Sequence, residues 1–127
     1  MTAYPAPAAI LDAVTRFLRD ELLPTIDGRE AFQLRVSINA IDLVAREIAH
    51  GAHAHAITAD GIASLLGERV ENATPQALCE AIEQDDPGLD PDALLEHLRR
   101  ATIARLAIDQ PGYSAFRAAA EAGERPW

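Results

Sequence analysis

The 127 residues suffice for one domain with a single hydrophobic core, and the lone cysteine excludes an intrachain disulfide. Twenty acidic residues against eleven basic ones give a net charge of −9, which repels phosphate backbones and anionic lipid headgroups. We therefore expect no nucleic-acid or membrane partner. We expect a cytoplasmic protein, because the sequence shows no signal peptide and no apolar run near the ~20 residues that span a bilayer.

Apolar residues make up 49% of the chain and aromatic residues only 5%, with alanine abundant. Alanine-rich, aromatic-poor sequences favour closely packed helices over strands. The expected fold class is all-α, a compact single-domain bundle of five to six helices that covers residues 1–127.

The first helix is expected over residues 7–23, with Pro7 in its first turn and Pro24 just beyond its end. The second is expected over residues 29–50, with Gly51 as a left-handed stop. Its apolar residues form two faces, so we expect a central helix packed on several sides. One face holds Phe32, Val36, Ala40 and Leu43, and the other holds Leu34, Ile38, Ile41, Ala45 and Ile48.

Four shorter helices are expected after the second, each preceded by a residue whose side chain can cap the first turn. Their ranges and caps are 59–66 after Thr58, 75–84 after Thr74, 91–108 after Asp90, and 115–121 after Ser114. Gly67 should end the first of them. The tail closes with Trp127, which would either dock on a partner chain or stay disordered.

Three histidines, His50, His53 and His55, lie within six positions of one another. If the helix stops at Gly51, the i, i+4 spacing of helical zinc ligands is lost, and structural zinc sites usually need four ligands. We interpret the cluster as a helix end followed by a solvated loop and expect no metal.

One side of the second helix carries a polar stripe, formed by Arg35, Asn39, Asp42 and Arg46. On the helix over 91–108, Arg105 falls at helical spacing among the residues expected in the core. A buried guanidinium needs a carboxylate, which Asp42 or Asp27 could supply. The hypothetical ligand-binding set is therefore Arg35, Asn39, Asp42 and Arg105, around an anionic or acyl ligand. The alternative is a structural ion-pair network that fixes the packing of the second helix against the helix over 91–108, or an Arg at the bundle edge with its charge in water.

Motifs for catalysis are missing: there is no nucleophile elbow, phosphate-binding loop or dinucleotide fingerprint. Cys79 is expected to be a buried, inert thiol, since no histidine is near it in sequence. The acidic run around Asp85 to Asp92 fits turn and cap chemistry better than a calcium loop. We expect no catalytic residue and no cofactor.

Residues 23–47, "LPTIDGREAFQLRVSINAIDLVARE", and residues 98–114, "LRRATIARLAIDQPGYS", carry a resemblance. The chain resembles a family of small bacterial domains of unknown function, over most of its length. Members tend to be encoded beside aminoglycoside-phosphotransferase-like kinases and acyl-CoA dehydrogenases. The resemblance implies an accessory role near such enzymes, and it supplies no catalytic residue.

We therefore expect a non-enzymatic accessory or interaction protein, a partner of a phosphotransferase-like kinase or of an acyl-CoA dehydrogenase, with a homodimer as a further expectation. The alternative is a module that binds a small anionic or acyl ligand.

Overall fold

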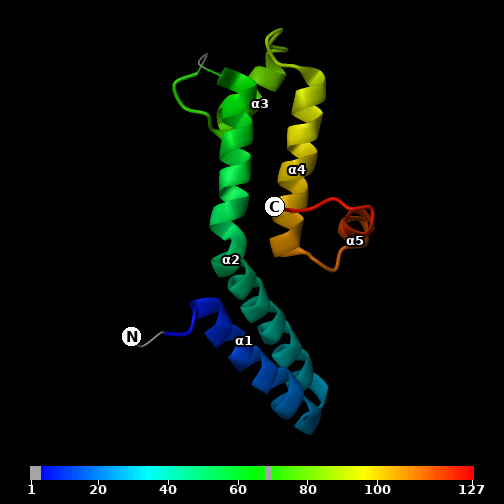
Figure 1. Ribbon diagram of the computed structural model, residues 1–127. Coiled ribbons are helices and arrows are strands. Elements are labelled where there is room, and N and C mark those ends of the chain that lie inside the picture. The colour runs from blue at the N-terminus through cyan, green and yellow to red at the C-terminus, as the bar shows by residue number, and fades with distance from the viewer. Residues whose placement is uncertain (1–3, 68–69) are drawn as a thin grey trace. The chain divides into compact units, whose positions relative to one another are not determined.

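The computed structural model describes residues 4–67 and 70–127, and within these ranges every regular element is helical (Figure 1). The elements are α1 (Pro7–Phe17), the π-helical turn η1 (Leu18–Leu22), the 3₁₀ turn η2 (Leu23–Thr25), α2 (Gly28–Leu66), α3 (Pro75–Glu83), α4 (Pro91–Asp109) and α5 (Ser114–Glu121). The predicted all-α class is confirmed. The chain divides into two compact units, unit 1 (Met1–Gly51) and unit 2 (Ala52–Trp127), and α2 contributes residues to both.

Several helix boundaries follow the local signals in the sequence. The Thr74 hydroxyl accepts a bond from the Ala77 amide at 3.1 Å, and the Asp90 carboxylate accepts one from the Asp92 amide at 3.3 Å. Gly67 adopts a φ of +60° directly after α2, as expected for a glycine that ends a helix. Local capping chemistry therefore sets these ends.

The predicted helix end at Gly51 is wrong. α2 runs without interruption for 39 residues through Gly51 and Thr58, and it includes the helix predicted over 59–66. A glycine inside a helix costs only about 1 kcal/mol. Ala54 and Ile57, just beyond it, are buried in one cluster with Ala104 and Ile108 of α4, and this burial outweighs the cost.

Unit 1 is a helical hairpin in which α1 lies alongside the first part of α2 (Figure 1). Among residues 4–51, the buried side chains are Thr15 on α1 and Ala31, Ile38 and Ala45 on α2. The three α2 residues repeat every seven positions and so form one stripe. The prediction that this helix is packed on several sides is wrong in unit 1, where the whole face of Phe32, Val36, Ala40 and Leu43 is exposed.

Unit 2 holds two clusters of buried apolar residues. The first joins α2 to α4 through Ala54, Ile57, Ala104 and Ile108. The second is built from Ile62 and Leu66 at the end of α2 and Leu78 of α3, with part-buried residues of α3 and α4 around them. α5 lies beside α4 (Figure 1). The two clusters hold α2, α3 and α4 together, and α2 and α4 line the larger cavity described below.

Candidate functional site

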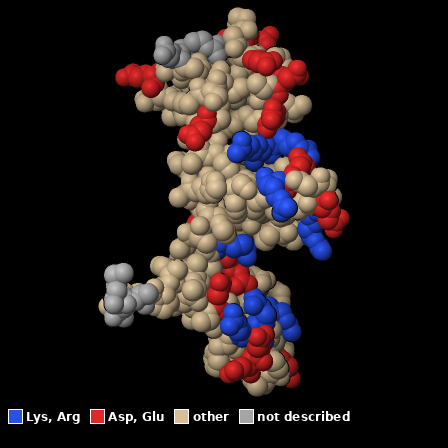
Figure 2. All heavy atoms as spheres, viewed as in Figure 1, with Lys and Arg blue, Asp and Glu red and all other residues tan. Residues whose placement is uncertain are grey.

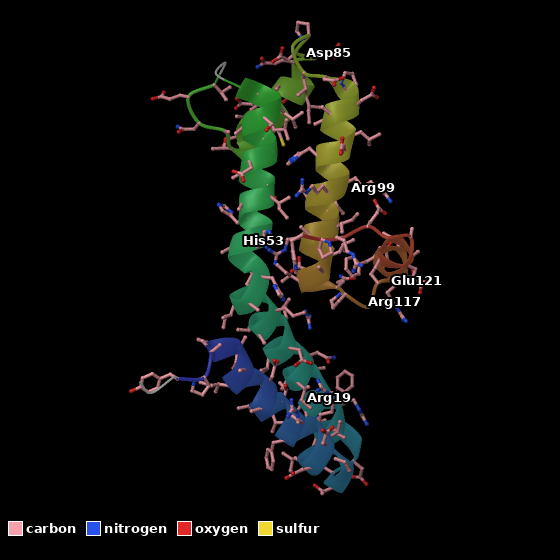
Figure 3. All side chains as sticks on the ribbon, in the orientation of Figure 1. Arg19, His53, Asp85, Arg99, Arg117 and Glu121 are labelled. Atoms are coloured by element: carbon pink, nitrogen blue, oxygen red, sulfur yellow. The ribbon has the colours of Figure 1, made fainter. Side chains whose placement is uncertain are left out.

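The polar residues predicted to bind a ligand take separate roles. Arg35 and Asn39 are exposed on α2, while Asp42 is half-buried and accepts a hydrogen bond from Arg19 of α1 at 2.5 Å (Figure 3). Arg105 donates from Nε and Nη2 to the Asp109 carboxylate one turn further along α4, at 2.8 and 2.6 Å. The Asp42 and Arg105 contacts are ion pairs, but the first joins α2 to α1 and the second lies within α4, so neither links the second helix to the helix over 91–108.

Arg105 does not face the core, contrary to the sequence prediction. Its side chain is 47% exposed, because Ile103, Ala104 and Ile108 form the buried face of α4. Neither the cavity between α2 and α4 nor the one between α4 and α5, both described below, is lined by Arg35, Asn39, Asp42 or Arg105. A ligand-binding role for these four residues therefore stays a prediction.

The most conspicuous surface of unit 1 is an apolar stripe along α2, formed by Phe32, Val36, Ala40 and Leu43 and called here the outer stripe. Phe32 is 64% exposed, Val36 52% and Leu43 38%. At 3.6 residues per turn the four side chains fall within about 80° of one another around the helix. The outer stripe lies about 150° around α2 from the buried Ala31, Ile38 and Ala45, so α1 packs on the opposite side of the helix.

Seven further large apolar side chains of unit 1 are exposed, namely Tyr4, Ile10, Val14, Phe17, Leu22, Val44 and Ile48. Together with Phe32, Val36 and Leu43 they place large exposed apolar side chains on both α1 and α2. A two-helix hairpin has too few layers to bury all of its apolar residues by itself. Unit 1 therefore presents surface suited to another protein chain.

Charge divides unevenly between the two units. Residues 1–51 hold seven acidic and five basic residues, whereas residues 52–127 hold thirteen acidic and six basic ones. Figure 2 shows acidic and basic side chains side by side on the visible face of unit 1. Unit 1 is thus nearly neutral, and most of the chain's negative charge belongs to unit 2.

The larger cavity of unit 2 has a volume of about 490 Å³ and lies between α2 and α4. Its lining combines polar and apolar residues: His53, Ala56, Ile57, Asp60, Gly61, Ser64, Leu65, Ala93, Glu96, His97 and Arg100. Its volume lies in the range of small-molecule sites. Burial lowers the pKa of the His97 imidazole, so its neutral form is favoured.

Gly61 makes room for His97 at this cavity. A Cβ atom on Gly61 would overlap the imidazole ring of His97. Sequence reasoning missed both residues, although a glycine inside a strongly helical pattern is a signal of close packing.

The second cavity, of about 360 Å³, is mainly apolar and lies between α4 and α5. Its walls include Leu95, Leu98, Tyr113 and Phe116, with Arg99 at the polar part of the lining. Leu95 is 68% exposed, so this cavity opens to solvent along one side.

The three clustered histidines lie on α2 and not in a loop, because the helix continues through Gly51. The rings of His53 and Trp127 stack with centroids 5.6 Å apart and an interplanar angle of 29°. Among the described residues, no group of three or more His, Cys, Asp or Glu side chains could hold a metal ion. Cys79 is exposed on α3, so the prediction of a buried thiol is wrong.

The C-terminal segment of unit 2 is held by an ion pair. Gly123 follows the end of α5 with a φ of +95°, and the Gly123 and Glu124 amides donate to the Ala120 and Ala119 carbonyls, the bonding pattern of a glycine-ended helix. Arg99 Nε and Nη2 donate to the two carboxylate oxygens of Glu124, both at 2.5 Å (Figure 3). This bonding raises the pKa of Arg99 and lowers that of the Glu124 carboxyl.

Residues 24–113 match the family described as domain of unknown function (DUF6285). The chain belongs to the DUF6285 family. The matched range holds α2, α3 and α4 entire, and with them the outer stripe and all residues that line the larger cavity. No curated protein and no solved structure matches this DUF6285 chain. The resemblance seen in the sequence, to a small family of unknown function, is thereby confirmed.

Within residues 4–67 and 70–127 of this DUF6285 protein, no helix combines the length and the apolar character needed to cross a membrane.

Proposed function

We propose that this DUF6285 protein is a non-enzymatic interaction protein that works in the cytoplasm by associating with another protein chain through unit 1. The observation that carries the proposal is the exposed outer stripe, together with the other large apolar side chains around the hairpin. Exposed apolar side chains that share one side of a helix, as those of the outer stripe do, are a usual mark of a protein-binding region. Burying it would remove apolar side chains from water at about 25 cal/mol per Å².

The candidate partner chains are a second copy and the enzymes that the family resemblance implies, a phosphotransferase-like kinase or an acyl-CoA dehydrogenase. The test measures association of the full-length protein with itself and with each enzyme by sedimentation velocity. We expect at least one complex, and we expect Val36→Glu to weaken it, because a carboxylate on the outer stripe would be buried without a partner.

Ser37→Glu is the matched control. Ser37 is exposed on the same helix but lies outside the outer stripe, so this variant should associate as the wild type does. The proposal fails if the wild-type chain forms no complex with any of these partners, or if Val36→Glu associates as strongly as the wild type.

A second candidate function is the binding of a small anionic or acyl ligand, favoured by the 490 Å³ cavity and by the Arg100 guanidinium in its lining. Thermal-shift measurements with acyl-CoAs and phosphorylated metabolites test it. A ligand should raise the thermal unfolding midpoint of the wild type and leave the midpoint of Arg100→Ala unchanged. If no compound raises the wild-type midpoint, this candidate function is wrong.

A further inference from the structure

The residues of the outer stripe have the spacing of a helix-pairing seam. Phe32, Val36, Ala40 and Leu43 are separated by four, four and three residues, the intervals that keep apolar side chains on one side of a helix. All four are exposed, and α1 packs on the opposite side of α2. The seam is therefore complete in sequence and lacks a helix against it within unit 1.

Residues of opposite charge lie at the two ends of this seam. Arg29 and Glu47 are both exposed and are 18 residues apart, which is five full turns of an α-helix. They therefore lie on the same edge of the outer stripe, within about 30° of its centre. Glu47 also interacts within its own chain, and a carboxylate has acceptor positions for more than one donor.

This arrangement is complementary to itself when two copies run antiparallel. A two-fold axis at the level of Ile38 brings each residue i of one copy to residue 76 − i of the other. Arg29 then faces Glu47 of the second copy, and the pair occurs twice by symmetry. In a parallel pairing, Arg29 of one copy would lie beside Arg29 of the other, and Glu47 beside Glu47. No ion pair between Arg29 and Glu47 would then form between the copies.

The same register also matches apolar residues near the centre of the seam. Val36 lies opposite Ala40 of the second copy, so a larger side chain meets a smaller one. Asn39 lies one residue from the axis and beside the outer stripe. Its amide both donates and accepts, so two Asn39 side chains can bond to one another and fix the register.

We propose that unit 1 pairs with a second copy of this chain, α2 against α2 in antiparallel orientation along the outer stripe, with an Arg29–Glu47 ion pair at each end. The inference rests on the proposed function and names its partner. The near neutrality of unit 1 supports a copy over an unrelated chain, because pairing brings little like charge together although the whole chain carries −9.

The test is sedimentation equilibrium of the full-length protein over micromolar concentrations. We expect a dimer for the wild type and a monomer for Val36→Glu, with circular dichroism to verify that the variant stays helical. Ile10→Glu is the matched control, since Ile10 is 50% exposed but lies on α1, and it should dimerise normally.

A charge exchange tests the register. Arg29→Glu and Glu47→Arg should each raise the dimer Kd roughly tenfold, because each replaces two attractive pairs by repulsive ones. The double variant should return the Kd to within about threefold of the wild-type value, because it restores both pairs in the opposite sense.

Four results would overturn the inference. The double variant could dimerise no better than the single ones, or Ile10→Glu could dissociate the dimer while Val36→Glu leaves it intact. The wild type could also be monomeric while binding a kinase or dehydrogenase through Val36, which would overturn the second copy and leave the proposed function standing. A wild type that binds neither itself nor an enzyme would end both.

Discussion

The imidazole of His97 on α4 occupies space that the missing side chain of Gly61 on α2 leaves open. A Cβ atom at Gly61 would overlap the ring, which itself lies at the wall of the larger cavity. The glycine thus sets how closely these two helices approach, a constraint that arises only once the helices are packed.

Gly61→Ala should destabilise unit 2, although the same change stabilises an ordinary helix. Alanine gains about 1 kcal/mol in helix propensity, and overpacking against His97 loses about 1–3 kcal/mol. Urea unfolding followed by the fluorescence of Trp127, the only tryptophan, measures the net change.

Gly51→Ala is the control for this prediction. Its Cβ would meet only the flexible end of the Glu47 side chain, at 2.9 Å from Oε1, so a gain of up to about 1 kcal/mol is expected. The double variant Gly61→Ala/His97→Ala should recover most of the stability lost in Gly61→Ala. Equal effects of the two alanines would contradict the account of the close approach.

Acidification should destabilise the protein through His97. Burial lowers its folded-state pKa below the ordinary 6.5, so below pH 6.5 the unfolded chain binds the proton more readily than the folded one. The free energy of unfolding therefore falls as the pH drops from about 6.5 to the lowered pKa and is unaffected by this group above 6.5. His97→Gln should unfold with a weaker pH dependence in that window; an unchanged slope would contradict the prediction.

The contact between Arg99 and Glu124 should release the C-terminal segment in acid. Because the folded-state pKa of Glu124 is lowered from 4.5, its contribution is present above 4.5 and is lost as the pH falls through the lowered value. Trp127 should then leave His53, which its fluorescence reports. Glu124→Gln should show the released signal already at pH 7, and Glu121→Gln, a change on the neighbouring α5, should behave as the wild type.

Arg105→Ala should have a small effect, because Arg105 and Asp109 are 47% and 42% exposed. Exposed pairs at i, i+4 contribute about 0.3–0.5 kcal/mol. Urea unfolding of Arg105→Ala, Asp109→Ala and the double variant gives the coupling energy. A loss above about 3 kcal/mol in Arg105→Ala would instead indicate the buried guanidinium that the sequence suggested.

Two predictions from the sequence failed most clearly: that the second helix ends at Gly51, and that Arg105 lies on the buried face of its helix. Gly51 carries the local signature of a helix stop, and Arg105 lies at helical spacing among apolar residues. Neither pattern records which neighbouring helix buries which side chain. Burial of Ala54 and Ile57 carries α2 through Gly51, while Ile103, Ala104 and Ile108 turn Arg105 toward solvent.

The sequence by itself determined the all-α class, the caps at Thr74 and Asp90, the end of α2 at Gly67 and the two apolar faces of α2. These depend on interactions within a few residues, which sequence spacing records directly. Only the tertiary structure decided that one face is covered by α1 and the outer stripe is not, that Gly61 seats His97, and that Arg99 holds Glu124. These depend on contacts between residues far apart in the chain, because the neighbour that packs on a helix is set by the whole fold.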